Sequence, residues 1–201
     1  DTIINEVEKG LQTKDDLTIL ASCVLISSIA TTISSNLVDV DSLLPQFVPL
    51  LIHPNPDIRY HSTEACLTLL SFSRPQTSVS GISLVVFNLI TEVPMEDILR
   101  FLNLLSKCIN HDVKLSSELA VHFANFTLAM MNVDPDATMY NRAMIGGSSH
   151  VSMSLMNIDE NTHEILLPKT LRVIRFCIES ENLNERNFGI SMIKKLINLF
   201  P

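Results

Sequence analysis

The 201-residue sequence predicts an all-α fold, and three properties of the chain support this expectation. Apolar residues make up 46% of the chain and charged residues 18%, so a large buried core can form. Only five glycines are present, which is few for a protein built from tight turns. No stretch alternates apolar and polar residues with a period of two for long enough to require a strand. Helices are therefore the expected building blocks.

Apolar periodicity and helix breakers together place the helices along the chain. Pro94 with the acids Glu96 and Asp97 indicates one helix start, because acids favour the positive end of a helix. The expected helices lie at about 2–11, 16–35, 41–53, 57–73, 81–91, 95–109, 112–131, 164–179 and 184–200.

The second of these helices contains an uncharged segment, 17–38, that is long enough to span a bilayer. Its serines and threonines nevertheless gather on one side of the helix, opposite Cys23, Ile26 and Ile33. This amphipathic pattern predicts a helix that packs against protein, and we expect no membrane span.

The turn between the third and fourth helices, HPNPDIRYH, carries two histidines and an aspartate at intervals of four residues. On one continuous helix, His53, Asp57 and His61 would share a face and could hold a metal. Pro54 and Pro56 break that helix, because each lacks an N–H and disfavours helical geometry in the preceding residue. We therefore expect a structural turn, with Asp57 as the N-cap acceptor of the next helix.

This turn provides a template for finding internal repeats. The template is an acid, an apolar residue and a base, followed by small residues. Similar orders begin at residues 16, 112 and 184. The first spacing, from 16 to 57, matches a helical hairpin repeat of about 40–47 residues. The later spacings are longer because of an extra helix at 81–91 and an irregular segment at 132–162. The expected turn residues are Asp16, Asp57, Arg59, Asp112, Lys114 and Arg186.

The segment LLPQFVPLL at 43–51, followed by PNPDIR at 54–59 and Ala65, resembles a HEAT or armadillo repeat. The similarity is good over 41–73 and fair over 95–131, and it does not separate the two repeat types. The resemblance implies one α-solenoid domain over 1–201, an armadillo-like superhelix of about four hairpins. It also implies that Arg59 pairs with an acid of the neighbouring repeat, for which Asp16 is a candidate.

Residues 132–162 carry no strong pattern and are expected to form an irregular insert, which is commonly functional or mobile at this length. Six of the eight methionines lie in or beside it, and methionine adapts to irregular surfaces where partners dock. The segment either folds back over its own helices or contacts a partner. The candidate interaction residues are Met139, Tyr140, Arg142, Met144, Met153 and Met156.

Charge and cysteine usage exclude several functional classes. A net charge of −8 argues against sequence-specific nucleic-acid binding, which needs a basic face. The four cysteines lie more than forty residues apart with no zinc spacing, so we expect free core thiols, an intracellular reducing compartment, and no metal. No nucleophile–base pair is apparent, and we expect neither an enzyme nor a cofactor.

Together these observations predict a non-catalytic scaffold that binds other protein subunits. We expect the assembly module of a subunit in a large intracellular complex, and a fragment of a longer protein, because the chain begins at Asp1 and not at Met. The Ser/Asn-rich helices suggest a nuclear, chromatin-remodelling type of complex, although no motif favours the nucleus over the cytoplasm. The alternative is a helical domain that binds a small molecule or lipid, with 132–162 as its lid.

Overall fold

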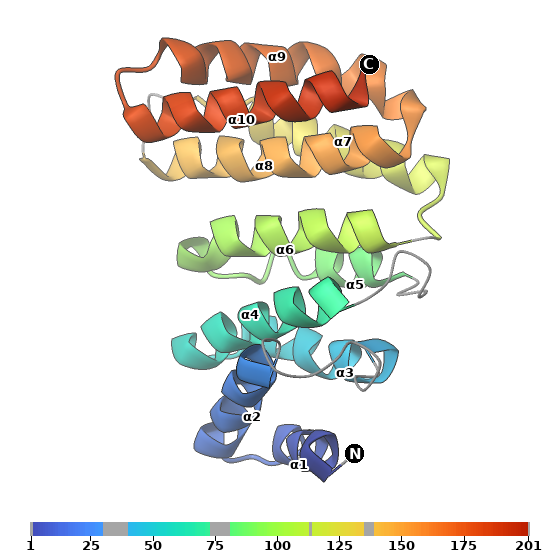
Figure 1. Cartoon of the computed structure of the whole chain (residues 1–201), viewed down its shortest axis with the longest axis vertical. Helices are drawn as coiled ribbons and strands as arrows, with labels where there is room; N and C mark the ends of the chain where they lie inside the picture. Colours follow the sequence, from blue (N-terminus) through green and yellow to red (C-terminus); the bar gives the residue numbers. More distant parts are fainter. Residues whose placement is uncertain (1, 30–39, 73–80, 113, 135–138, 201) are drawn as a thin grey trace. The chain divides into compact units, whose positions relative to one another are not determined.

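The computed structural model describes residues 2–29, 40–72, 81–112, 114–134 and 139–200, except for the side chains of Thr2, Met139 and Tyr140. The described residues form ten α-helices and three short 3₁₀ helices with no strand (Figure 1). The all-α prediction is confirmed. The expected end of the second helix at residue 35 lies outside the described residues.

The chain divides into two compact units, residues 1–114 and residues 115–201, and each is described by itself. Unit 1 contains α1 (Thr2–Leu11), α2 (Asp16–Ile29), α3 (Val40–Phe47), η1 (Val48–Ile52), α4 (Pro56–Phe72), α5 (Ile82–Asn88), η2 (Met95–Asp97) and α6 (Ile98–His111). Unit 2 contains α7 (Ser117–Met131), α8 (Met139–Ile158), η3 (Glu160–Thr162), α9 (His163–Glu179) and α10 (Leu183–Leu199). The prediction of a single domain over 1–201 stays a prediction.

Consecutive helices pack in pairs, α1 with α2, α3 with α4, and α5 with α6 in unit 1, and α7 with α8 and α9 with α10 in unit 2. Each helix alone would expose its apolar stripe, and pairing covers part of that stripe. Within unit 1, α4 also packs against α2, which precedes it in the sequence, and against α6, which follows it. The described residues therefore form five helix pairs and not the four expected, because α5 pairs with α6 and the segment expected to be irregular supplies α8.

The core of unit 1 is built from large side chains that are almost fully buried. Leu44, Phe47, Ile58, Leu69 and Phe101 are each no more than 1% exposed. Pro49 lies at the start of η1, where a missing N–H leaves no hydrogen bond unmade, and the chain changes there from α to 3₁₀ geometry. The sequence prediction of 41–53 as one helical segment corresponds to α3 followed by η1.

Unit 2 has a core cluster of Met131, Ile145, Val173 and Cys177, against which Phe188 packs. Helices α9 and α10 approach closely at Gly189, where an added Cβ would lie 3.0 Å from Cys177 Cβ and 3.3 Å from the Ile174 carbonyl. A side chain at Gly189 would therefore force the two helices apart.

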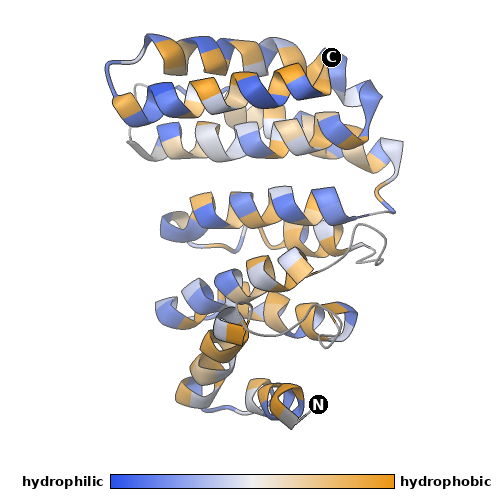
Figure 2. Cartoon of the chain, viewed as in Figure 1, coloured by the Kyte–Doolittle hydropathy of each residue, from blue (hydrophilic) through white to orange (hydrophobic). Residues whose placement is uncertain are grey.

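The principal correction to the sequence analysis is α8. The segment 132–162, expected to be an irregular insert, is a 20-residue helix over Met139–Ile158 that packs against α7 and α9. Its buried side carries serines, and Ser148, Ser149 and Ser152 are each 0% exposed. Figure 2 shows the resulting pale, intermediate hydropathy along much of α8, in contrast to the alternating colours of α9 and α10.

Among the described residues, no helix combines the length and the apolar composition that crossing a membrane requires.

Candidate functional site

The turn between η1 and α4 is organised by Asn55, not by Asp57 as expected. The side chain of Asn55 accepts a hydrogen bond from the Asp57 backbone N–H at 3.0 Å, so Asn55 is the N-cap and Pro56 is the first helical residue. The Asn55 backbone N–H in turn donates to Nδ1 of His53 at 3.1 Å. Asp57 lies one residue further into the first turn. The His53 ring therefore accepts a hydrogen bond within the turn, and His53 lies before α4, which begins at Pro56.

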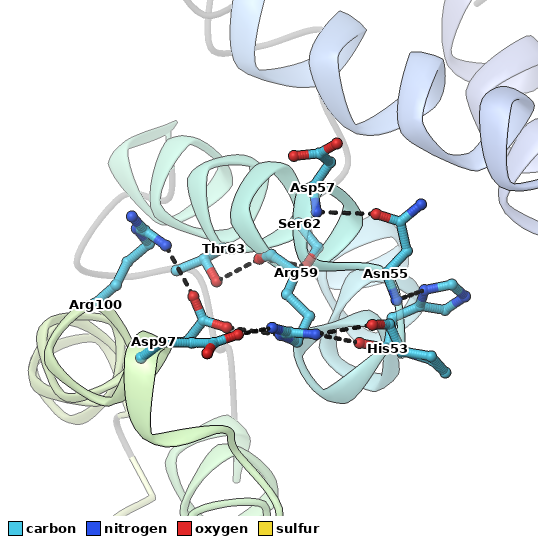
Figure 3. Close-up of polar contacts among 10 residues, drawn as sticks. His53, Asn55, Asp57, Arg59, Ser62, Thr63, Asp97 and Arg100 are labelled. Carbon is cyan, nitrogen blue, oxygen red and sulfur yellow. Dashed lines mark hydrogen bonds and ion pairs between the residues drawn. The ribbon is translucent and has the colours of Figure 1, made fainter.

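Arg59 follows in the same turn of α4 and is 5% exposed (Figure 3). Its Nη1 donates to the carbonyls of His53 and Pro54, each at 3.0 Å. Its Nε donates to Asp97 and its Nη2 to Glu96, each at 2.6 Å. The guanidinium thus joins the turn before α4 to the η2 segment before α6.

The acids that Arg59 binds are not the one expected. Asp16 contacts Asn55 Nδ2 at 3.2 Å and lies 3.9 Å from His53 Nε2, so it meets the turn but not the arginine. Asp97 is the more buried partner, with a side chain 16% exposed, and it also accepts from Arg100 at 3.1 Å. Arg59 therefore pairs with acids that follow it in the chain, Glu96 and Asp97, and the expected pairing with Asp16 is wrong.

The same turn recurs before α10. Asn182 accepts from the Asn184 backbone N–H at 2.9 Å, as Asn55 does from Asp57. The Asn182 backbone N–H donates to Ser180 Oγ at 3.1 Å, in the position of the His53 ring. Nη1 of Arg186 donates to the carbonyls of Ser180 and Glu181, each at 2.8 Å, the residues six and five positions before it. The carbonyls that Arg59 binds are likewise six and five positions before Arg59.

These matching hydrogen bonds make the two turns, 53–59 and 180–186, copies of one structural unit. Asp57 and Asn184, the positions matched in the sequence, each donate the backbone N–H to the asparagine of the turn, and the internal repeat stays a prediction.

The copy expected at residue 112 has a different structure. Asp112 is the residue after α6 and is 7% exposed, so it ends a helix and does not begin one. Its carboxylate accepts from the backbone N–H groups of Gly81 at 3.2 Å and Ser83 at 3.3 Å, and from the Ser83 hydroxyl. It also accepts from the Lys114 backbone N–H at 3.1 Å. Asp112 thus ties the end of α6 to the start of α5, while Ser116 caps α7.

The described methionines of the predicted interaction set are buried or half-buried. Met153 is 5% exposed and Met156 is 2% exposed, so these side chains are not available to a partner in this conformation. Met144 is half-buried. The side chains of Met139 and Tyr140 lie outside the described part of the structure. Packing of α8 against α7 and α9 accounts for the buried methionines, which corresponds to the self-docking alternative.

Among the described side chains of the predicted set, Arg142 is the exposed one, with 43% of its side chain exposed. It donates to Glu185 at 3.1 Å, and its guanidinium lies 5.9 Å from the centre of the Phe176 ring. Its predicted role in partner binding stays a prediction.

An open depression of about 180 Å³ lies on unit 2, lined by Met131, Val133, Ile145, Lys169, Arg172, Val173 and Phe176. Sites for drug-sized molecules usually enclose about 300–1,000 Å³. The depression therefore fits a side chain better than a whole ligand.

All four cysteines are free and buried. Burial raises the pKa of Cys23 to about 12, and burial also raises the pKa of the Cys66, Cys108 and Cys177 thiols. A thiol with a raised pKa carries little thiolate at neutral pH and is a weak nucleophile. Within the described ranges, no group of three His, Cys, Asp or Glu side chains could hold a metal ion.

No model of a known protein family matches the chain, and no curated protein is similar to it in sequence. The HEAT/armadillo resemblance stays a prediction.

Proposed function

We propose that the chain is a non-catalytic protein-interaction scaffold built as an α-solenoid of HEAT/armadillo type. The observation that supports this proposal is the repeated turn, in which Asn55 and Asn182, and Arg59 and Arg186, make the same hydrogen bonds at the same sequence offsets. A turn that recurs within two helix pairs is what a chain built from structural repeats would contain. Repeat units stack through their neighbours and leave long surfaces for partners.

The buried ion pair of Arg59 with Asp97 supports the stacking of consecutive hairpins in unit 1. A scaffold of this kind acts by presenting helix faces at fixed spacing, and its partners are other protein subunits. We propose an assembly role within a large intracellular complex, with a nuclear chromatin-remodelling type as the specific candidate. Tagging the protein in its native cells and imaging it would contradict the nuclear assignment if the signal were cytoplasmic.

The architecture can be tested by small-angle X-ray scattering. A compact 201-residue chain has a radius of gyration of about 16.5 Å, and a solenoid is longer. We expect a clearly larger radius and an elongated pair-distance distribution. A radius near the compact value would contradict the solenoid.

The scaffold role can be tested by affinity purification of the full-length protein from its native cells. We expect a fixed set of subunits at constant stoichiometry through a salt wash. Recovery of the protein alone, at endogenous expression level, would contradict the role.

The second candidate is a small-molecule or lipid-binding domain, for which the depression on unit 2 offers room for only part of a ligand, such as the end of an acyl chain. Native mass spectrometry after mild purification separates the two candidates. A retained ligand would favour the second candidate, and a mass equal to that of the protein alone would favour the scaffold.

A further inference from the structure

The two copies of the turn place α4 and α10 in register, so their faces can be compared position by position. With Arg59 aligned to Arg186, Thr63 aligns with Ile190 and Leu70 aligns with Ile197. Residues spaced by four and seven lie on the same side of a helix. Both sets of three therefore form a face that begins at the arginine of the turn.

In α4 this face is covered. Arg59 is 5% exposed, Thr63 is 6% exposed and Leu70 is 0% exposed. Helix α4 packs against α6, and the arginine binds the acidic pair that precedes α6, Glu96 and Asp97. Within the chain itself, this face is thus covered by a helix that two carboxylates precede.

In α10 the equivalent face is open. Ile190 is 47% exposed and Ile197 is 63% exposed, and Leu183 at the start of the helix is 62% exposed and continues the same stripe at a spacing of seven. Arg186 is only partly buried, and among the described residues nothing accepts a hydrogen bond from its Nε or Nη2, the two atoms through which Arg59 holds its acids.

We propose that this face of α10, formed by Leu183, Arg186, Ile190 and Ile197, is a docking surface for an amphipathic helix supplied by another polypeptide. The docked helix carries two adjacent carboxylates in its first turn, which bind Nε and Nη2 of Arg186, and an apolar stripe that covers the isoleucines. This inference rests on the scaffold proposal and names its partner's chemistry.

Charge complementarity selects this occupant. Carboxylates at a helix start are stabilised by the positive end of that helix and form charge-assisted hydrogen bonds with a guanidinium. A second copy of the chain fits less well, because its own Glu96–Asp97 pair is already bound by its Arg59.

The probe is a synthetic peptide with the sequence of residues 93–111, which contains the acidic pair and the α6 helix that cover α4. It is titrated into the full chain labelled at isoleucine δ1 methyls, and the methyl resonances are followed by NMR. We expect the Ile190 and Ile197 methyls to shift in a saturable way. Ile197→Asp should raise the Kd at least about tenfold, because binding would bury an unpaired charge.

Two matched controls make the result specific. Val85→Asp changes an apolar residue of similar exposure, 51%, on unit 1 and should leave the Kd unchanged. A peptide with Glu96→Lys and Asp97→Lys should bind at least about tenfold more weakly, since it repels Arg186. Helical content and melting of each protein variant are checked by circular dichroism, and Ile190→Asp provides a second variant on the face if Ile197→Asp alters folding.

Three outcomes would overturn the proposal. In the first, the peptide leaves the Ile190 and Ile197 methyl resonances unshifted. In the second, the charge-reversed peptide binds as tightly as the native one. In the third, sedimentation equilibrium shows a dimer that Ile197→Asp dissociates, so that the occupant is a second copy of the chain. The scaffold proposal fails separately. If the subunits recovered from native cells still bind Ile197→Asp, the scaffold stands and this surface is wrong, and if no subunits are recovered from cells, the scaffold fails whatever the peptide does.

Discussion

Replacing Arg59 by alanine should destabilise unit 1 by about 3 kcal/mol. The change removes four hydrogen bonds and leaves Asp97, with a side chain 16% exposed, without its closest cation. Removing one partner of a buried ion pair costs about 3–5 kcal/mol. The lower end of that range applies, because Glu96 is 70% exposed and Asp97 keeps Arg100.

Arg186→Ala is the matched control. Arg186 makes the same two bonds to turn carbonyls but no ion pair among the described residues, so its loss should cost about 1 kcal/mol. The difference between the two variants, about 2 kcal/mol, then measures the acidic pair.

The assay is urea unfolding of the full chain followed by tyrosine fluorescence. The sequence has no Trp and two Tyr, Tyr60 and Tyr140. In a Tyr140→Phe background the fluorescence comes from Tyr60 on α4, with Arg100 4.2 Å from its ring centre, and reports unit 1. Because Arg186 lies on unit 2, both variants are also followed by far-UV circular dichroism, which reports the helices of both units. With a slope of about 2 kcal/mol per molar urea, Arg59→Ala should lower the midpoint by about 1.5 M. A loss no larger than that of Arg186→Ala would refute the reasoning that Arg59 joins two hairpins.

Three further predictions concern the interior and one exposed cap. Met156→Ala should cost about 2–4 kcal/mol and Met156→Leu less than about 1.5 kcal/mol by urea unfolding, whereas equal, small losses would place the side chain outside the core. Ser148→Ala should be neutral or raise stability by about 1 kcal/mol, because the buried Ser148 hydroxyl has no hydrogen-bond partner among the described residues. A clear loss would reveal a partner for it. Hydrogen bonds from Thr18 lower the pKa of Asp15, so its contribution is present above the unfolded pKa of about 3.9 and is lost as pH falls toward the folded value. Asp15→Asn should keep the cap and remove this pH dependence from the acid limb of a stability-versus-pH curve, and an unchanged acid limb would contradict the assignment.

The sequence predicts the helices that carry a clear apolar stripe, and it fails at α8 for a physical reason. Two serines on the buried side of α8, Ser149 and Ser154, donate their hydroxyls to carbonyls of their own helix. Ser149 donates to the Ile145 carbonyl at 2.7 Å and Ser154 to the His150 carbonyl at 3.1 Å. Hydropathy therefore assigns these positions to a surface, and the Gly146–Gly147 pair strengthens the impression of a loop.

The candidate turns show the same division between what a pattern fixes and what packing fixes. The offset between Arg59 and Arg186 is visible in the sequence, since both follow an asparagine by four residues. The choice of Asp97 over Asp16 as the partner is not, because both neighbours of α4 offer an acidic helix start. The choice between Asp16 and Asp97 depends on the direction in which the Arg59 side chain points from α4.

The serine-lined side of α8 has a consequence for how this fold can vary among sequences. Serine and alanine differ by one oxygen, so a helix of this kind keeps its shape when its buried positions drift between the two. Ser152 is different, because its hydroxyl lies 2.7 Å from Thr170 Oγ1 and ties α8 to α9 through a bond between side chains that such drift would break. Side-chain volume, and not hydropathy, is thus the property that a distant relative of this chain would preserve along α8.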